Sequence, residues 1–305
     1  FYIKSNSFSI FLMSCHKIND NKIAELEEYN IFGEWTTCID TYKSKFQSAS
    51  PFGHVVINDF LRSDIAEKVF KSFPSNYEEW HNYNNPLEVK CAYDDIDNMD
   101  KSIQKVFLAL STPYAINKFS YITGIENLEY DPCLHGAGLH AHPRNGRLQL
   151  HLDYEKHPIL IDKERRLNII LFLTKDWKKE WNGSNQLWNQ NLTKAEVCTE
   201  VQFNTAIIFQ TNNISWHGLP DKIQCPENVF RKSLAYYYIS DLVSKAEEDK
   251  IGNNGTGHRA KATYIQHPYT PHNEKLEKLI KIRPFRRIEQ SDMDEIWPDW
   301  CPETD

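Results

Sequence analysis

The sequence predicts a mainly β protein, a β-sandwich or jelly roll supported by helices on its N-terminal side. Helix signals gather in the first third of the chain, and short strands separated by turn residues follow from about residue 130. A block of helices followed by many short strands is typical of a sandwich or barrel with helices packed against it. At 305 residues the chain could form two domains or one large barrel.

The first elements are indicated by their boundary residues. HVVIND (54–59) reads as a strand. Ser63 is expected to cap a helix that runs to about Phe73, because apolar residues recur at four-residue spacing between them. A further helix is expected to begin near Pro113 and to end at Gly124.

The later strands are short and are bounded by Asn, Gly, Pro and Asp. They are expected at 146–153, 166–173, 197–203, 205–210, 213–217 and 231–239. We expect three parts along the chain: an N-terminal segment (1–49), a core domain with its supporting helices (50–240) and a C-terminal extension (241–305) that wraps the barrel. Within the extension, NNGTG (253–257) is expected to be a mobile loop.

Composition excludes several classes of protein. A net charge of −7 gives no reason to expect nucleic acid, and no apolar run approaches the roughly 20 residues that span a bilayer, so a soluble protein is expected. Seven cysteines without a Cys-x-x-Cys pair argue against a disulfide framework and for an intracellular, reducing compartment, with the cytoplasm favoured. The first 12 residues could be a targeting segment, an expression remnant or a native strand. Nothing indicates an oligomeric state.

LQLHLDY (148–154) combines an apolar and a polar face. Side chains of a strand alternate between faces, so the leucines at 148, 150 and 152 point one way and are expected to pack under the helices. The opposite face, expected to line the barrel interior, carries Arg147, Gln149, His151 and Asp153. A His-x-Asp pair at this spacing places an imidazole and a carboxylate side by side, as two ligands of one metal require.

A third metal ligand is expected from a distant strand. NISWHG (213–218) offers His217, which lies 66 residues after His151. Two histidines and one carboxylate with open positions opposite them are the arrangement of non-haem Fe(II) oxygenases.

The next strand offers an anion site. RKSLAYYYI (231–239) places Arg231 and Ser233 on one face, and an arginine fork with a hydroxyl suits a carboxylate. Asn168 is a lone polar group in the apolar strand RLNIILFL (166–173). All three have a role if a dicarboxylate extends from the metal to the arginine.

These residues resemble the Fe(II)/2-oxoglutarate-dependent oxygenases, on the double-stranded β-helix (jelly-roll, cupin-like) fold. Several stretches over residues 50–240 are similar to its prolyl-4-hydroxylase-like branch: HVVINDFL, YDPCLHGAGLH, LQLHLDY, RLNIILFL, SWHGLP and RKSLAYYY. The resemblance implies that His151, Asp153 and His217 hold Fe(II). It also implies that Arg231, with Ser233, binds the distal carboxylate of 2-oxoglutarate and that Asn168 touches its metal-side end.

The resemblance implies an oxidoreductase that uses O2 and releases succinate and CO2, with ascorbate supporting the reaction in vitro. Hydroxylation is one outcome; desaturation and ring closure occur elsewhere in the superfamily, including oxidative cyclisations that make natural products in algae. Collagen-type prolyl hydroxylases have lysine where this chain has Arg231, which argues against that substrate. Halogenating members lack the carboxylate ligand, whereas Asp153 is present.

Basic residues near the expected mouth favour a small, anionic, amino-acid-like substrate. The residues expected to contact it are Arg147, Gln149, His140, Tyr237 and Trp188. His140 and His142 in LHAHP are expected on a loop without a third ligand, and thus not at a metal. Two alternatives stay open: a protein or peptide hydroxylase that holds its target with the C-terminal extension, and a non-catalytic jelly-roll module. A zinc hydrolase gives Arg231 and Ser233 no role.

Overall fold

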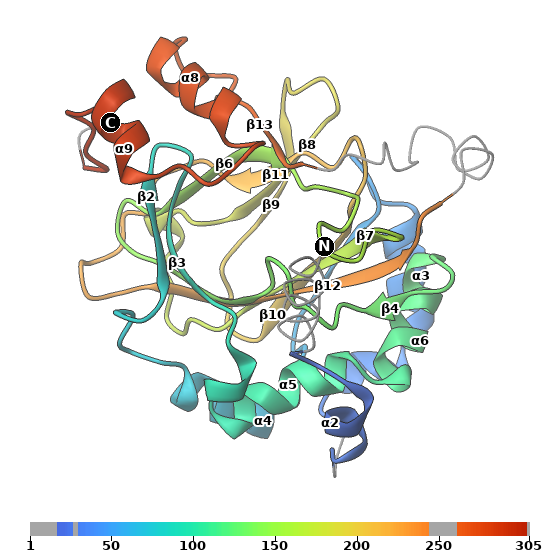
Figure 1. Cartoon of the computed structure of the whole chain (residues 1–305). Helices are drawn as coiled ribbons and strands as arrows, with labels where there is room; N and C mark the ends of the chain where they lie inside the picture. Colours follow the sequence, from blue (N-terminus) through green and yellow to red (C-terminus); the bar gives the residue numbers. More distant parts are fainter. Residues whose placement is uncertain (1–16, 27–29, 244–260, 304–305) are drawn as a thin grey trace, which may run out of the picture.

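The strands form one antiparallel sheet that curls into a nearly closed, barrel-like jelly roll (Figure 1). The computed structural model describes residues 17–26, 30–243 and 261–303. The main hydrogen-bonded order of strands is β1-β10-β7-β12-β5-β3-β6-β11-β8-β9, while β2 pairs with β3, β4 with β12 and β13 with β6. The described strands are β1 (His54–Ile57), β2 (His81–Asn85), β3 (Glu88–Tyr93), β4 (Glu129–Tyr130), β5 (Gly138–His142), β6 (Arg147–Leu152), β7 (Lys163–Phe172), β8 (Asn185–Trp188), β9 (Ala195–Thr199), β10 (Thr205–Gln210), β11 (His217–Leu219), β12 (Arg231–Asp241) and β13 (Thr263–Tyr264).

Helices support the barrel from two sides. Figure 1 shows α3 to α6 gathered along the lower and right-hand side of the sheet, and α8 and α9 at the opposite end. The described helices are α2 (Asp20–Ala24), α3 (Ile39–Gln47), α4 (Ser63–Ser72), α5 (Lys101–Leu110), α6 (Pro113–Thr123), α8 (Glu274–Ile282) and α9 (Gln290–Ile296). None of the helices in these described segments has the length and apolar character needed to cross a membrane.

The N-terminal helices bury their apolar faces against β7 and β12. The largest hydrophobic cluster joins residues of α4, α5 and α6 to strand residues such as Leu171 and Tyr236. The start of α6 follows the predicted chemistry, because the Thr112 side chain accepts a hydrogen bond from the Ala115 N–H and Pro113 is the first helical residue. Gly124 ends this helix with a φ of 72°, a left-handed conformation that glycine adopts without a steric cost.

Several predicted boundaries are wrong in detail. Helix α4 begins at Ser63, so the capping position is Arg62, which makes no side-chain capping bond. The expected strand 213–217 is a turn followed by β11, since the Asn212 N–H bonds the Ser215 hydroxyl at 2.9 Å and the extended ladder begins only at His217. The expected strand 197–203 lies earlier, as β9. Six of the described strands were not predicted: β2, β3, β4, β5, β8 and β13.

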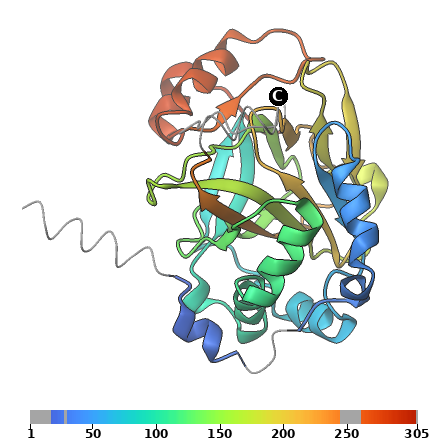
Figure 2. The ribbon, with the colours of Figure 1, turned by 90° about the vertical axis from the view of Figure 1, so that its right-hand side faces the viewer.

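The C-terminal segment adds to the sheet and covers one end of it (Figure 2). Strand β13 pairs with β6, where Tyr264 lies opposite His151. Helices α8 and α9 then enclose a hydrophobic cluster with this strand, and Arg283 forms an ion pair with the buried Glu88 of β3 at 3.0 Å. The expected packing of the leucine face under the N-terminal helices is wrong for Leu148, which contacts this C-terminal cluster.

The cysteines differ in part from the prediction. Cys38, Cys91, Cys198, Cys225 and Cys301 are free, but Cys133 is disulfide-bonded. This disulfide weakens the prediction of a reducing compartment, which rested on the spacing of the cysteines. The predicted loop at 253–257 lies outside the described residues.

Candidate metal centre and anion site

Strands β6 and β11 bring together the three residues predicted to bind a metal. The two strands pair so that His217 lies opposite His151, with ring centroids 4.3 Å apart. Asp153 follows β6 directly, and one ligand atom from each of the three residues lies within 4.8 Å of the others. All three side chains are buried. The polar face of β6 thus meets β11 in one compact cluster.

Backbone carbonyls orient both imidazoles. Nδ1 of His151 lies 2.9 Å from the Gln149 carbonyl oxygen, and Nδ1 of His217 lies 2.8 Å from the Ser215 carbonyl oxygen. A carbonyl only accepts, so each Nδ1 carries a proton, and Nε2 is the nitrogen that offers a lone pair when the ring is neutral. The Nε2 atoms face the Asp153 carboxylate, at 3.6 Å for His151 and 3.8 Å for His217.

The protonation states suit metal binding. Burial and the neighbouring His151 lower the pKa of His217 to about 4, so its ring is neutral near pH 7. Burial opposes ionisation of Asp153, but Arg165 and the two histidines outweigh it and hold its pKa far below the usual range. Two imidazoles and one carboxylate gathered in one cluster are a donor set that fits Fe(II).

Arg165 lies behind the metal carboxylate and was not predicted. Its Nη1 lies 3.4 Å from Oδ2 of Asp153, and its Nη2 donates to the His135 carbonyl oxygen at 2.7 Å. The guanidinium also lies over the rings of Tyr154 and Tyr237, 4.0 and 3.4 Å from their centroids. In the sequence it belongs to a basic cluster at 163–166, a pattern that usually indicates a solvated surface; the apolar strand that follows was the only available signal.

Asn168 lies at the metal end of β7. Its Nδ2 donates to Oδ2 of Asp153 at 3.5 Å, and it pairs across the sheet with Tyr237. Residues directly opposite each other in an antiparallel pair share a face. Tyr237 and Asn168 therefore both belong to the surface that carries the metal carboxylate.

Arg231 is a buried cation that pairs with no carboxylate among the described residues. Only 1% of its surface is exposed, its Nε donates to the Gly183 carbonyl oxygen at 2.7 Å, and Nη2 has no hydrogen-bond partner in the described part of the chain. Burial lowers its pKa to about 9, which still leaves it charged near pH 7. The buried Ser233 hydroxyl likewise lacks a partner among the described residues. Buried polar groups normally have partners, so this pair fits an anion.

The sheet register joins the anion site to the metal cluster. On β12 the residues that alternate with Arg231 lie opposite β7: Ser233 opposite Phe172, Ala235 opposite Ile170, and Tyr237 opposite Asn168. One continuous face therefore runs from Arg231 to the residue that touches Asp153, with an apolar floor between its two polar ends. This arrangement fits a short dicarboxylate such as 2-oxoglutarate.

The prediction that His140 and His142 lie on a loop is wrong. Both belong to β5, where His142 pairs with Arg231 and His140 with Ser233. Burial, together with nearby cations, holds the pKa of both rings well below the usual value. They border the anion site as neutral rings, and neither belongs to a described cluster that could hold a metal.

The remaining residues that were predicted to contact the substrate lie in two different places. Arg147 and Gln149 are buried on β6, and Arg147 lies over the ring of Trp300 at 5.6 Å, at the C-terminal cover. Trp188 faces away from the metal, because its neighbour Leu187 is the residue opposite His217. It packs against His267 and Tyr269.

A second group, Asp131, Cys133 and His157, also has ligand atoms close together. The disulfide of Cys133 removes its thiolate as a ligand. Asp131 instead accepts from the Cys133 and His135 N–H groups and lies 3.3 Å from His157, so this group supports the loop before β5.

A family model matches the middle part of the chain. Residues 137–239 match the family model described as the 2OG-Fe(II) oxygenase superfamily. No curated protein matches the chain.

Similar solved structures include a Pseudomonas putida prolyl-4-hydroxylase, with 14% identity, 66% of this chain and 97% of that chain covered, and a TM-score of 0.48. A Trichoplax adhaerens prolyl hydroxylase in complex with a hypoxia inducible factor peptide fragment has 14% identity, 74% and 96% coverage, and a TM-score of 0.48. HygX from Streptomyces hygroscopicus, bound to nickel, 2-oxoglutarate and hygromycin B, has 12% identity, 62% and 83% coverage, and a TM-score of 0.39.

Proposed function

We propose that this protein is an oxygenase that uses Fe(II) and 2-oxoglutarate, as its match to the 2OG-Fe(II) oxygenase model over residues 137–239 indicates, and that it oxidises a C–H bond of a small, anionic, amino-acid-like metabolite. The observation that carries the proposal is the face of β7 and β12 that leads from the cluster of His151, Asp153 and His217 to the buried Arg231, which has no carboxylate partner among the described residues. A metal-binding module without catalysis would have no use for the arginine.

Each residue has a proposed role. His151, Asp153 and His217 hold the metal with their lone pairs already oriented. Arg231 and Ser233 bind the distal carboxylate of 2-oxoglutarate, and Asn168 lies at the end nearest the metal. When bound, Fe(II) and 2-oxoglutarate supply the oxidising chemistry, in which O2, cosubstrate and substrate give succinate, CO2 and oxidised substrate.

The proposed substrate class follows from charge and enclosure. Arg147 on β6 is a second buried cation on the strand that carries His151, and it suits a carboxylate of the substrate. Gln149, His140 and Tyr237 are the proposed neutral contacts. Trp188 is not retained, because it faces the C-terminal cover. Tyr264 and Trp300 enclose this end, which favours a small molecule and keeps water out.

The test is a mass-spectrometric screen of amino-acid-derived metabolites with the Fe(II) enzyme, 2-oxoglutarate and O2. Gain of one oxygen identifies hydroxylation, and loss of two hydrogens identifies desaturation or the oxidative cyclisation proposed for natural-product biosynthesis. Turnover of peptides, with none of any acidic metabolite, would replace the proposal by a peptide hydroxylase.

Uncoupled turnover separates the enzyme from a binding module. We expect slow conversion of 2-oxoglutarate to succinate with Fe(II) and ascorbate when no substrate is present. The cytoplasm remains the proposed compartment, because the described cysteines other than Cys133 are free thiols.

A further inference from the structure

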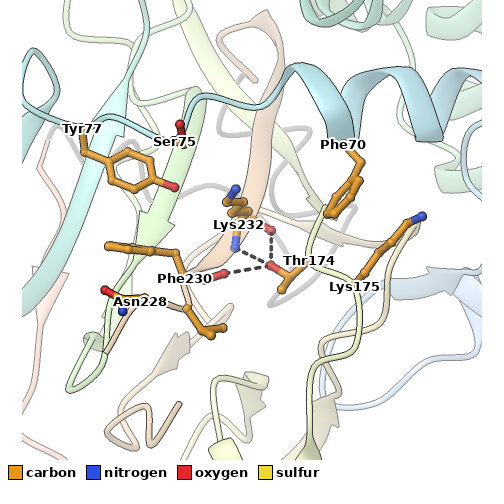
Figure 3. Close-up of a pocket in the computed structure, with 9 residues that line it drawn as sticks. Phe70, Ser75, Tyr77, Thr174, Lys175, Asn228, Phe230 and Lys232 are labelled. Carbon is orange, nitrogen blue, oxygen red and sulfur yellow. Dashed lines mark hydrogen bonds between the residues drawn. The ribbon is translucent and has the colours of Figure 1, made fainter. Parts of the chain in front are cut away.

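A cavity lies beside the start of β12, the strand that begins with Arg231 (Figure 3). Its volume is about 240 Å³. It lies between helix α4, the residues that follow β7 and the start of β12, and it is lined by Phe70, Ser75, Tyr77, Thr174, Lys175, Asn228, Val229, Phe230 and Lys232.

Strand alternation separates this cavity from the anion site. Lys232 stands between Arg231 and Ser233 on β12, so its side chain points to the opposite face. The backbone is fixed here, because the Lys232 N–H donates to the Thr174 hydroxyl at 2.6 Å and that hydroxyl lies 3.2 Å from the Phe230 carbonyl oxygen. A ligand in this cavity and one at Arg231 would lie on different faces of the same strand.

Lys232 gives the cavity a cation that the described chain does not neutralise. Its side chain is half-buried, burial lowers its pKa, and no described carboxylate forms an ion pair with it. The other lysine differs, since Lys175 pairs with Glu67 at 2.5 Å. A partly desolvated ammonium without a counter-ion favours an anion in the space beside it.

The walls are aromatic, with polar groups at their edge. The rings of Tyr77 and Phe230 contact each other at 4.6 Å between centroids, and Phe70 lies across the cavity from them (Figure 3). The Tyr77 hydroxyl is directed into the cavity, and it makes no hydrogen bond to another described residue. Aromatic walls with a few convergent polar groups are typical of sites for small organic ligands.

We propose that this cavity is a second ligand site, which takes a small aromatic carboxylate. The carboxylate would pair with Lys232 and accept from the Tyr77 hydroxyl, while the ring would pack between Phe70 and Phe230. The volume of about 240 Å³ exceeds the roughly 150 Å³ of a cavity that binds benzene, so it suits one substituted benzene ring. The site needs no reaction and does not depend on the proposed function.

The test is a fluorine NMR titration with 4-fluorobenzoate on protein loaded with Zn(II) and N-oxalylglycine, which keep the Arg231 site filled. We expect saturable binding with a Kd below 1 mM, roughly the range of weak specific ligands. No saturable binding would overturn the proposal, as would binding that appears only when N-oxalylglycine is left out.

Variants of two residues that line the cavity test whether the ligand binds there. Lys232→Met keeps the apolar stem and removes the charge, so affinity should fall about tenfold or more. Lys68→Met is the matched control, because Lys68 lies on the same helix as Phe70 but is exposed and does not line the cavity. Equal binding by Lys232→Met, with an unchanged melting temperature, contradicts the proposal, and so does equal affinity for the neutral 4-fluorobenzamide. Tyr77→Phe should weaken binding several-fold without closing the cavity.

Discussion

Tyr264 stacks on the proposed metal ligand His151. The two residues lie opposite each other in the β13–β6 pair, with ring centroids 5.0 Å apart and planes tilted by 13°. His217 flanks His151 from the other neighbouring strand. The C-terminal segment therefore forms one wall of the metal cluster.

Replacement of Tyr264 by alanine should disturb both the fold and the metal site. The lost buried ring should cost about 3–5 kcal/mol of unfolding free energy, as for other large aromatic truncations. Co(II) affinity, measured by titration of its visible absorption, should fall as well, because His151 loses its stacked neighbour. Tyr269→Ala removes an exposed tyrosine from the same segment and is the control. Equal effects of the two variants would contradict the assigned role of Tyr264.

Asp153→Ala should abolish turnover. The variant also leaves Arg165 buried without this carboxylate, a change that typically costs about 3–5 kcal/mol, so its melting temperature should drop. Asp153→Asn retains an acceptor for the guanidinium and should lose activity with a smaller loss of stability. Full activity in either variant would show that the metal assignment is wrong.

Arg231→Met should raise the 2-oxoglutarate concentration needed for half-maximal rate by at least about tenfold, since a charge-assisted hydrogen-bonded pair is worth about 1.5–3 kcal/mol. Co(II) affinity without cosubstrate should stay nearly unchanged. Arg231→Lys, which keeps the charge but loses the fork, should be intermediate. An unchanged requirement in Arg231→Met would remove the assigned role.

Arg165→Met should destabilise the metal-free protein, because Asp153 would then be buried without its guanidinium partner. A bound cation can replace the missing positive charge beside this carboxylate. Saturating Co(II) should therefore raise the melting temperature of the variant by more than it raises that of the wild type. Equal Co(II)-induced shifts would mean that Arg165 does not act through Asp153.

Acid should destabilise the metal-free protein through its buried histidines. Burial and the nearby Arg165 lower the pKa of His135 to about 4, and burial holds the pKa values of His140 and His142 well below their usual value. These rings stay neutral in the folded state while the unfolded chain takes up protons below about pH 6.5. The neutral rings therefore contribute fully to the unfolding free energy above about pH 6.5. This contribution is lost progressively toward pH 4, at about 1.4 kcal/mol per pH unit for each ring.

The check is a set of urea unfolding curves in EDTA between pH 7.5 and 5. His142→Gln should reduce the slope of the unfolding free energy against pH by about 1.4 kcal/mol per pH unit, which is the contribution of one ring. His272→Gln, at an exposed site, is the control for loss of a histidine. A slope unaffected by His142→Gln would contradict the predicted protonation state.

The metal cluster was predictable because strand geometry is local. Alternation alone places His151 and Asp153 on one face, and the strand order brings His217 opposite. Arg165 was missed because its burial depends on Tyr154, Asp153 and Tyr237, which only the folded sheet brings around it. No periodicity or residue spacing in the sequence predicts such a contact.

The other errors have the same origin. LHAHP (139–143) was predicted to be a loop and ends in Pro143, yet pairing with β12 keeps residues 138–142 extended. The turn before β11 was read as a strand because Ile214 and Trp216 alternate with polar residues. There a local bond between Asn212 and Ser215 overrides the alternation.

The addition of β13 to β6 has a consequence for biosynthesis. Strand β6 carries His151, but the Leu150 carbonyl receives its partner N–H from Ile265, which the ribosome adds much later. The nascent chain can assemble most of the barrel before that hydrogen bond exists. We therefore expect the metal cluster to reach its final form, and to bind iron, only after β13 has been synthesised.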